Sequence, residues 1–134
     1  SDYIFTLPNL NGPWQMTLTV DSTAYTPHEN MQVKYDVLLF QQGSDVRGTG
    51  EKVMDIVGSD TTRYIGAQRV RIEIEGYLDR NYLARDELVL HYIESGKKRR
   101  TSAFQELIRF NEDYMLGGFT WTASNSKGHV EWTR

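Results

Sequence analysis

The side chains of this chain that are best suited to hold a ligand are aromatic rings and arginines. Aromatic rings stack on planar ligands, and a guanidinium group donates paired hydrogen bonds to phosphate or carboxylate. On this basis we expect a ligand to contact six residues: Tyr35, Arg71, Tyr77, Tyr92, Arg109 and Trp121. The alternative for the aromatic residues is that they are ordinary core side chains. Arg71 lies on the strand face opposite Ile72 and Ile74, and this pattern predicts that it points outward.

The sequence carries none of the residue patterns typical of catalysis or metal binding. His28, His91 and His129 lie far apart and share no metal-ligand spacing, and the chain contains no cysteine. It contains no nucleophile elbow, phosphate-binding glycine loop or HExxH pattern, and no pair of carboxylates stands out as acid and base. We therefore expect a binding protein without enzymatic activity, cofactor or bound metal.

The chain has one basic cluster, Lys97-Lys98-Arg99-Arg100, which follows the turn-forming residues Glu94-Ser95-Gly96. The simplest interpretation is a solvated hairpin turn. The alternative is a small patch that binds phosphate or faces a membrane. The formal net charge of -3 argues against binding to polymeric nucleic acid, because neutralising a phosphate backbone needs a cationic surface. A small anionic ligand is compatible with this charge.

Alternating apolar and polar residues indicate the strands that position these side chains. Trp14, Met16, Leu18 and Val20 alternate with polar residues, and this period of two places one face of a strand on a core. Eight segments show strand character: 14–21, 31–40, 46–55, 69–78, 87–93, 100–110, 114–123 and 129–134. The stretch 103–109 also fits helical spacing, and we assign it to a strand.

Short turn-forming groups separate most of these segments, so neighbouring strands are expected to pair antiparallel. Such a sheet has two edges with unpaired backbone groups, and closing it into a barrel removes them. We therefore predict one all-β domain over residues 1–134, a small closed antiparallel up-and-down barrel of about eight strands. Two longer connections, 21–30 and 56–68, are expected to shape its mouth. Gly48, Gly50, Gly117 and Gly118 are expected to mark bends or bulges.

No segment of the sequence is apolar over a length that would cross a bilayer, since the longest aliphatic or aromatic run is 37–40. The chain begins Ser1-Asp2-Tyr3, without an initiator methionine. We interpret residues 1–11 as a lead-in to the barrel. One explanation for this lead-in is a linker to a membrane segment that is absent from this chain.

Gly12-Pro13-Trp14, at the start of the first expected strand, resembles the G-x-W motif of lipocalins and related barrels. The resemblance implies that Trp14 closes one end of the barrel and that an arginine from a late strand packs over it. Arg134 or Arg109 is expected in that position. The barrel is therefore expected to be lipocalin-like, and one function that follows is a carrier of a small hydrophobic molecule.

Four segments of the sequence carry a second resemblance: LNGPW at 10–14, LLFQQGSDVRGTGE at 38–51, LGGFTW at 116–121 and GHVEWTR at 128–134. Together they resemble the β-barrel receptor domain of two-transmembrane effectors in bacterial CBASS anti-phage systems. In that family, two membrane helices precede a minimal barrel that binds a cyclic dinucleotide and triggers membrane disruption. This chain lacks such helices, as a receptor domain separated from its anchor would.

The second resemblance leads to the main functional hypothesis, a receptor domain that senses a cyclic dinucleotide in antiviral defence and controls an attached membrane effector segment. Aromatic rings would stack on the bases, arginines would hold the phosphates, and binding would promote self-association. The resemblance also implies a location in the bacterial cytoplasm, tethered to the inner membrane. The alternatives are the lipocalin-like carrier and a structural interaction barrel with no pocket.

Overall fold

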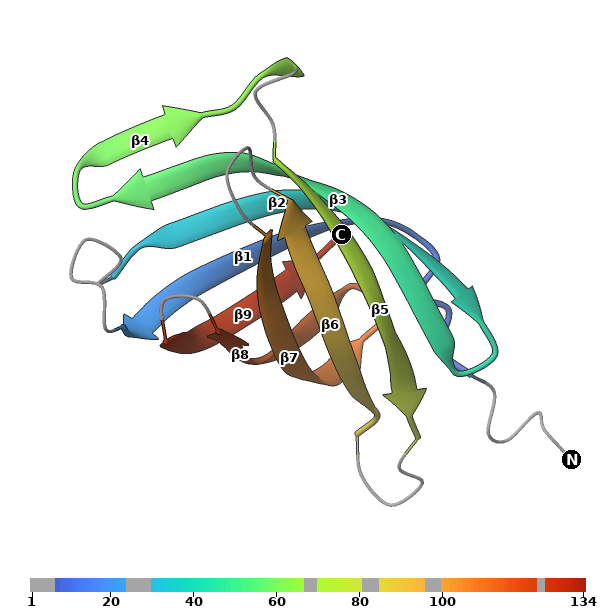
Figure 1. The fold of residues 1–134 in the computed structure, drawn as a ribbon. Helices are drawn as coiled ribbons and strands as arrows, with labels where there is room; N and C mark the ends of the chain where they lie inside the picture. Colours follow the sequence, from blue (N-terminus) through green and yellow to red (C-terminus); the bar gives the residue numbers. More distant parts are fainter. Residues whose placement is uncertain (1–6, 24–29, 67–69, 81–84, 96–99, 123–124) are drawn as a thin grey trace, which may run out of the picture.

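The structure of the chain, a computed structural model, describes residues 7–23, 30–66, 70–80, 85–95, 100–122 and 125–134. Nine strands lie in these ranges (Figure 1): β1 (Gly12–Ser22), β2 (Gln32–Gln42), β3 (Asp45–Val57), β4 (Asp60–Arg63), β5 (Arg71–Asp79), β6 (Glu87–Ser95), β7 (Arg100–Asn111), β8 (Tyr114–Trp121) and β9 (Ser126–Thr133). Within the same ranges, no helix has both the length and the apolar character needed to cross a membrane.

Eight of the strands form a closed antiparallel barrel (Figure 1). They pair in the order β1-β2-β3-β5-β6-β7-β8-β9, and the pairing of β9 with β1 closes the ring. β4 pairs with the end of β3, and these two strands form a hairpin that extends beyond the barrel (Figure 1). The predicted closed barrel of eight strands is confirmed. Residues 60–63 were predicted to belong to a long connection, and they form a ninth strand instead.

The barrel interior is filled by the inward-facing side chains that alternate along each strand. In β1, Trp14, Met16 and Leu18 are buried, whereas Gln15 between them is exposed. Burial of one strand face stabilises the fold by roughly 25 cal/mol for each Å² of apolar surface removed from water. The same alternation runs through 103–107 in β7, so the assignment of that stretch to a strand is confirmed.

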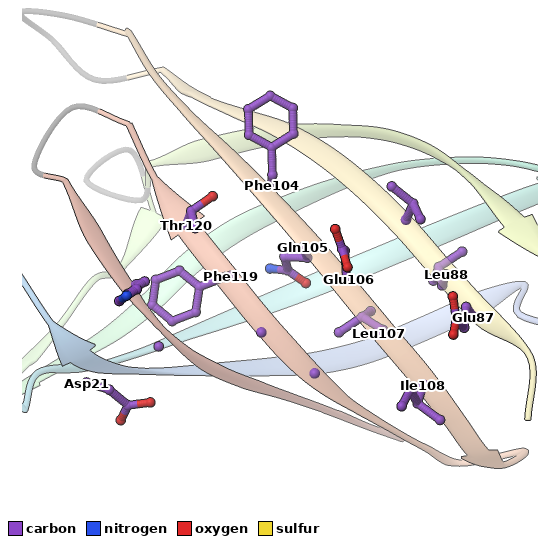
Figure 2. A pocket seen from close by; sticks show the side chains of 15 residues that line it. Asp21, Glu87, Leu88, Phe104, Gln105, Glu106, Leu107, Ile108, Phe119 and Thr120 are labelled. Carbon is purple, nitrogen blue, oxygen red and sulfur yellow. The ribbon is translucent and has the colours of Figure 1, made fainter.

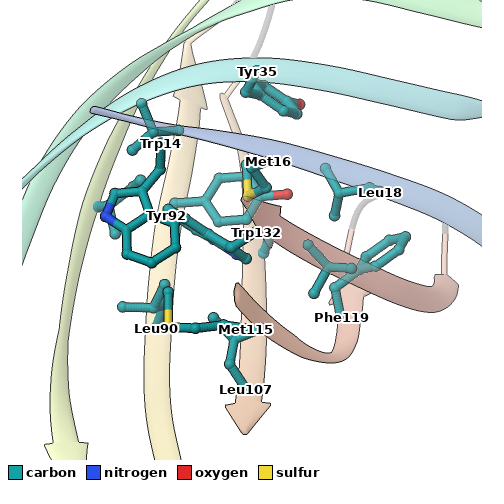
Figure 3. Close-up of a cluster of buried hydrophobic side chains, with 14 of the residues drawn as sticks. Trp14, Met16, Leu18, Tyr35, Leu90, Tyr92, Leu107, Met115, Phe119 and Trp132 are labelled. Carbon is teal, nitrogen blue, oxygen red and sulfur yellow. The ribbon is translucent and has the colours of Figure 1, made fainter. Parts of the chain in front are cut away.

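Aromatic side chains around Trp132 occupy the centre of this core (Figure 3). The rings of Trp14 and Trp132 meet edge to face, with their centroids 6.2 Å apart. The indole Nε1–H of Trp132 donates to Oε1 of the buried Gln105 at 2.9 Å, and Nε2 of Gln105 lies 3.0 Å from Sδ of Met16. Because a buried amide is costly without hydrogen bonds, these contacts hold Gln105 and Trp132 in one arrangement.

Trp14 and Arg134 close the end of the barrel at which β1 begins. The indole Nε1–H of Trp14 donates to the Leu10 carbonyl at 2.9 Å, and the Arg134 guanidinium carbon lies 4.3 Å from the centre of the Trp14 ring. Arg134 also donates to the carbonyls of Asn9 and Asn11, at 2.7 and 3.0 Å. The arginine expected over Trp14 is therefore Arg134, the last residue of the chain as given.

The register of the barrel shifts at three described places: Val20 to Ser22 in β1, Lys34 to Tyr35 in β2, and Arg109 to Asn111 in β7. Gly48, Gly50, Gly117 and Gly118 lie away from these shifts, so the expected bulges are not found at these glycines, and the expected bends stay a prediction. Gly117 serves close packing between strands instead. A Cβ atom at Gly117 would lie 1.8 Å from the Glu106 carbonyl oxygen, and only glycine fits there.

Candidate functional site

Two charged residues of β3, Lys52 and Asp55, face the barrel interior together because of a β-bulge. Tyr35 of β2 pairs with Lys52, and Val33 pairs with Asp55, so one β2 residue opposes two β3 residues between these pairs. In a regular strand, residues three apart point to opposite faces. The extra residue of the bulge shifts the alternation of β3 by one, so that the side chains of Lys52 and Asp55 both point inward. Both charges lie beside the buried Tyr35 and Val33.

The two charges join a hydrogen-bonded network. The Nζ atom of Lys52 lies 3.2 Å from Oε1 of Glu94 and 3.8 Å from Oδ2 of Asp55. The Tyr35 hydroxyl donates to Oε2 of Glu94 at 2.7 Å, and the Tyr64 hydroxyl donates to Oδ2 of Asp55. One cation, two carboxylates and two phenols from four separate parts of the chain therefore meet at one place.

Two further aromatic residues adjoin this network. The rings of Tyr35 and Tyr92 meet edge to face with centroids 6.3 Å apart, and the Trp121 indole donates to the Tyr92 hydroxyl at 3.0 Å. We name the whole group the mouth cluster: Tyr35, Lys52, Asp55, Tyr64, Tyr92, Glu94 and Trp121. It lies toward the end of the barrel at which β6 and β8 finish, and Trp14 near the start of β1 closes the other end.

The phenols of the mouth cluster keep their protons well into the alkaline range. Burial, reinforced by the neighbouring Tyr92 and Glu94, raises the pKa of Tyr35 well above 10. Burial likewise raises the pKa of Tyr92. Burial, followed by the hydrogen bond to Asp55, raises the pKa of Tyr64. At neutral pH these three side chains are therefore neutral hydroxyl groups that can donate hydrogen bonds.

Asp55 is the buried acidic residue of the mouth cluster, with 9% of its surface exposed. Its Oδ2 atom accepts from Tyr64 and faces Lys52, whereas its Oδ1 atom is buried without a hydrogen-bond partner among the described residues. A buried acceptor without a donor is destabilising by about 1–3 kcal/mol. The mouth cluster thus contains a buried acceptor for which the described residues supply no donor.

The structure brings together three of the six residues that we expected to contact a ligand: Tyr35, Tyr92 and Trp121. The other three lie elsewhere. Arg71 points outward as its alternation predicts, with 82% of its side chain exposed, and Tyr77 is 51% exposed on the outer face of β5. Arg109 lies near the closed end of the barrel, where it lines a hollow of about 460 Å³ together with Arg134.

Sequence reasoning missed Lys52, Asp55, Tyr64 and Glu94. Glu94 had a usable signal, because it continues the inward alternation of Leu88, Leu90 and Tyr92 along β6. Lys52 and Asp55 had none, since the bulge that unites them depends on pairing with β2. Of the basic cluster, the structure describes the backbone of Arg100, which pairs with Ser95 of β6 at the start of β7. Residues 97–99 of that cluster and 24–29 of the first long connection lie outside the described residues.

A larger hollow, of about 620 Å³, lies on the outside of the barrel over β6, β7, β8 and β9 (Figure 2). Glycines at 117, 118 and 128 form part of its floor, and the exposed side chains of Phe104 and Ile108 stand beside it. Its acidic groups, Asp21, Glu87 and Glu106, are exposed to solvent. The described residues contain no group of three or more potential metal ligands, here or elsewhere. The buried polar network therefore makes the mouth cluster the better candidate for chemistry.

Comparison with known proteins identifies the architecture alone. No family model matches the sequence, and no curated protein matches it. Among solved structures, the chain is similar to a redesigned beta barrel, mFAP1, bound to DFHBI, with a TM-score of 0.64 at 9% identity over 93% of this chain and 94% of that one. A second redesigned beta barrel matches with a TM-score of 0.57 at 13% identity, over 93% of this chain and 90% of that one. At such identities the likeness concerns the fold.

Proposed function

We propose that this barrel is a receptor for a small ligand that binds at the mouth cluster, and that the ligand is a cyclic dinucleotide. The observation that carries the proposal is the ionic and aromatic network inside one end of the barrel. Burying Lys52, Asp55 and Glu94 contributes little to stability compared with apolar packing of the same volume. A few convergent polar groups at an otherwise apolar site are typical of ligand-binding pockets, and this supports the proposal.

The mouth cluster offers the surfaces that a nucleotide base requires. Tyr64 and Trp121 are partly buried aromatic rings, and a base can stack on rings of this kind. Lys52 supplies a cation within the cluster. Trp132 and Met16 are fully buried in the packed interior (Figure 3), so a ligand would bind at the mouth cluster and not deeper in the barrel. The redesigned beta barrel with the similar fold is bound to DFHBI, and a barrel of this fold that holds a ligand is compatible with the proposal.

The resemblance to CBASS effector receptors supplies the biological part of the proposal. In this view, the barrel senses the nucleotide in the bacterial cytoplasm and controls a membrane effector segment attached to it at the inner membrane. Ligand binding would promote self-association of the barrel, because a ligand shifts any equilibrium between states that bind it unequally. Polymeric nucleic acid is not expected as a partner at a net charge of -3.

Isothermal titration calorimetry against a panel of cyclic di- and trinucleotides tests the proposal. We expect one member to bind the unaltered chain and to bind Trp121→Ala at least about tenfold more weakly, because a stacking surface is lost. Tyr77→Ala is the matched control, since Tyr77 is an aromatic residue on the outer face, and it should bind like the unaltered chain. No heat of binding with any member of the panel would contradict the proposal.

A lipocalin-like carrier is the second candidate, and the closure of one barrel end by Trp14 and Arg134 favours it. The packed interior favours the third reading, a structural interaction barrel without a ligand. Displacement of a fluorescent fatty-acid probe separates these two from each other. Displacement of the probe without any binding of cyclic nucleotides would favour the carrier over the receptor. No response in either assay would favour the structural barrel.

A further inference from the structure

Asp55 has unused hydrogen-bonding capacity inside the mouth cluster. Its Oδ2 atom accepts from the Tyr64 hydroxyl and lies 3.8 Å from Nζ of Lys52. Its Oδ1 atom is buried and has no partner among the residues that the structure describes. A carboxylate oxygen accepts up to two hydrogen bonds, so Oδ1 has hydrogen-bonding capacity that the described residues leave unused.

Glu94, the second carboxylate of the cluster, is already engaged on both oxygens. Its Oε1 atom lies 3.2 Å from Nζ of Lys52, and its Oε2 atom accepts from the Tyr35 hydroxyl at 2.7 Å. Lys52 in turn is shared between the two carboxylates. Lys52 therefore holds Asp55 in place through Oδ2. Of the two carboxylates, only Asp55 has an oxygen atom, Oδ1, that lacks a partner among the described residues.

We infer that Oδ1 of Asp55 accepts a hydrogen bond from an N–H group of the ligand, and that the site takes a nitrogen heterocycle with an exocyclic amino group. This inference rests on the proposed function, because it names the part of the ligand that enters the mouth. A phosphate against Asp55 would be repelled by the carboxylate, whereas an amino group satisfies it. The base therefore contacts Asp55, and the phosphates stay toward solvent.

Free nucleosides test this inference without the phosphates of the proposed ligand. Adenosine and guanosine carry an exocyclic amino group, and purine riboside is a nucleoside whose base has no N–H donor. By calorimetry at millimolar ligand, we expect at least one of the two amino nucleosides to bind about tenfold more tightly than purine riboside, because a hydrogen bond to a charged acceptor is lost in the latter. This comparison uses the unaltered chain and depends on no variant.

Two variants assign the preference to Asp55. In Asp55→Asn the charged acceptor becomes neutral, and the tenfold preference should fall to about threefold or less. Asp36→Asn is the control, because Asp36 is an exposed carboxylate on β2, and it should keep the full preference. The indole N–H signals of the tryptophans locate the ligand: that of Trp121 should shift on titration, whereas that of Trp14 at the closed end should not.

The outcomes separate this inference from the proposed function. Equal binding of the three nucleosides, no binding of any, or a preference that survives in Asp55→Asn would overturn the inference. If a cyclic dinucleotide still binds in those cases, the proposed function stands without it. If an amino nucleoside shows the expected preference and no cyclic nucleotide binds, the inference stands and the proposed ligand is wrong.

Discussion

Arg134 joins the end of β9 to two other parts of the barrel. Its guanidinium group covers the Trp14 ring and donates to the carbonyls of Asn9 and Asn11. Its Nε atom donates to the Glu112 carbonyl at 2.9 Å, in the turn between β7 and β8. A planar guanidinium group suits this position because it can stack on a ring and donate from its edge at once.

Arg134→Met should therefore lower the free energy of unfolding by about 1–3 kcal/mol, since it removes the donors and keeps most of the apolar stem. Urea unfolding followed by circular dichroism measures the change. Arg47→Met is the control, because Arg47 is an exposed residue of β3. An equally small effect of both substitutions would show that the closed end does not depend on Arg134.

At the scale of the strands, two adjacent glycines of β8, Gly117 and Gly118, differ in the space around them, because a side chain at each would point to an opposite face of the sheet. A Cβ atom at Gly117 would lie 1.8 Å from the Glu106 carbonyl oxygen of β7, and carbonyl oxygens in a strand ladder cannot easily move. A Cβ atom at Gly118 would lie 3.5 Å from the Gly128 carbonyl oxygen, which is an ordinary contact. Close packing of β7 and β8 thus requires glycine at 117 but not at 118.

Gly117→Ala should destabilise the barrel by about 2 kcal/mol or more, because the two strands must move apart. Gly118→Ala should change the free energy of unfolding by less than about 0.5 kcal/mol, as surface substitutions usually do. Thermal or urea unfolding of the two variants side by side gives the comparison. If both were tolerated equally, the approach of β7 to β8 at Gly117 would be looser than described.

For the whole molecule, burial of tyrosines inside the closed barrel makes stability depend on pH in the alkaline range. Burial raises the pKa of Tyr35 and Tyr92 above the ordinary tyrosine value of 10. Between pH 10 and these raised values the unfolded chain loses protons that the native barrel keeps. The stability that the neutral phenols contribute is therefore complete below pH 10 and is lost as the pH rises through the raised values.

We accordingly expect the free energy of unfolding to fall as the pH rises above 10, and to fall less steeply in Tyr92→Phe, which has no phenol to ionise at that position. Urea unfolding on both sides of this pH measures the slope. Tyrosinate absorbance in the native protein should show buried phenols that ionise only with unfolding. Identical slopes in the unaltered chain and in Tyr92→Phe would argue against this account.

The sequence by itself indicated the eight strands of the barrel and its closure, but not β4, because period-two alternation and turn chemistry are local properties of the chain. The contact of Trp14 with Arg134 was also partly predicted, because the resemblance to the G-x-W motif implied an arginine over Trp14 and two arginines were candidates. The alternation also placed Arg71 on the outer face of β5, where the structure shows it, whereas Tyr77 was expected to contact a ligand and lies on the same outer face. The same local pattern held a signal that Glu94 follows Tyr92 toward the interior, and this signal was not used.

Only the tertiary structure decided the mouth cluster. Lys52 and Asp55 are three residues apart and share a face because β2 and β3 shift register between them, and this shift belongs to the strand pair. Tyr35 and Glu94 are 59 residues apart and meet across the barrel interior because of the tilt and closure of the sheet. A local pattern contains neither the register between strands nor the tilt, and both are needed to bring these side chains to one place.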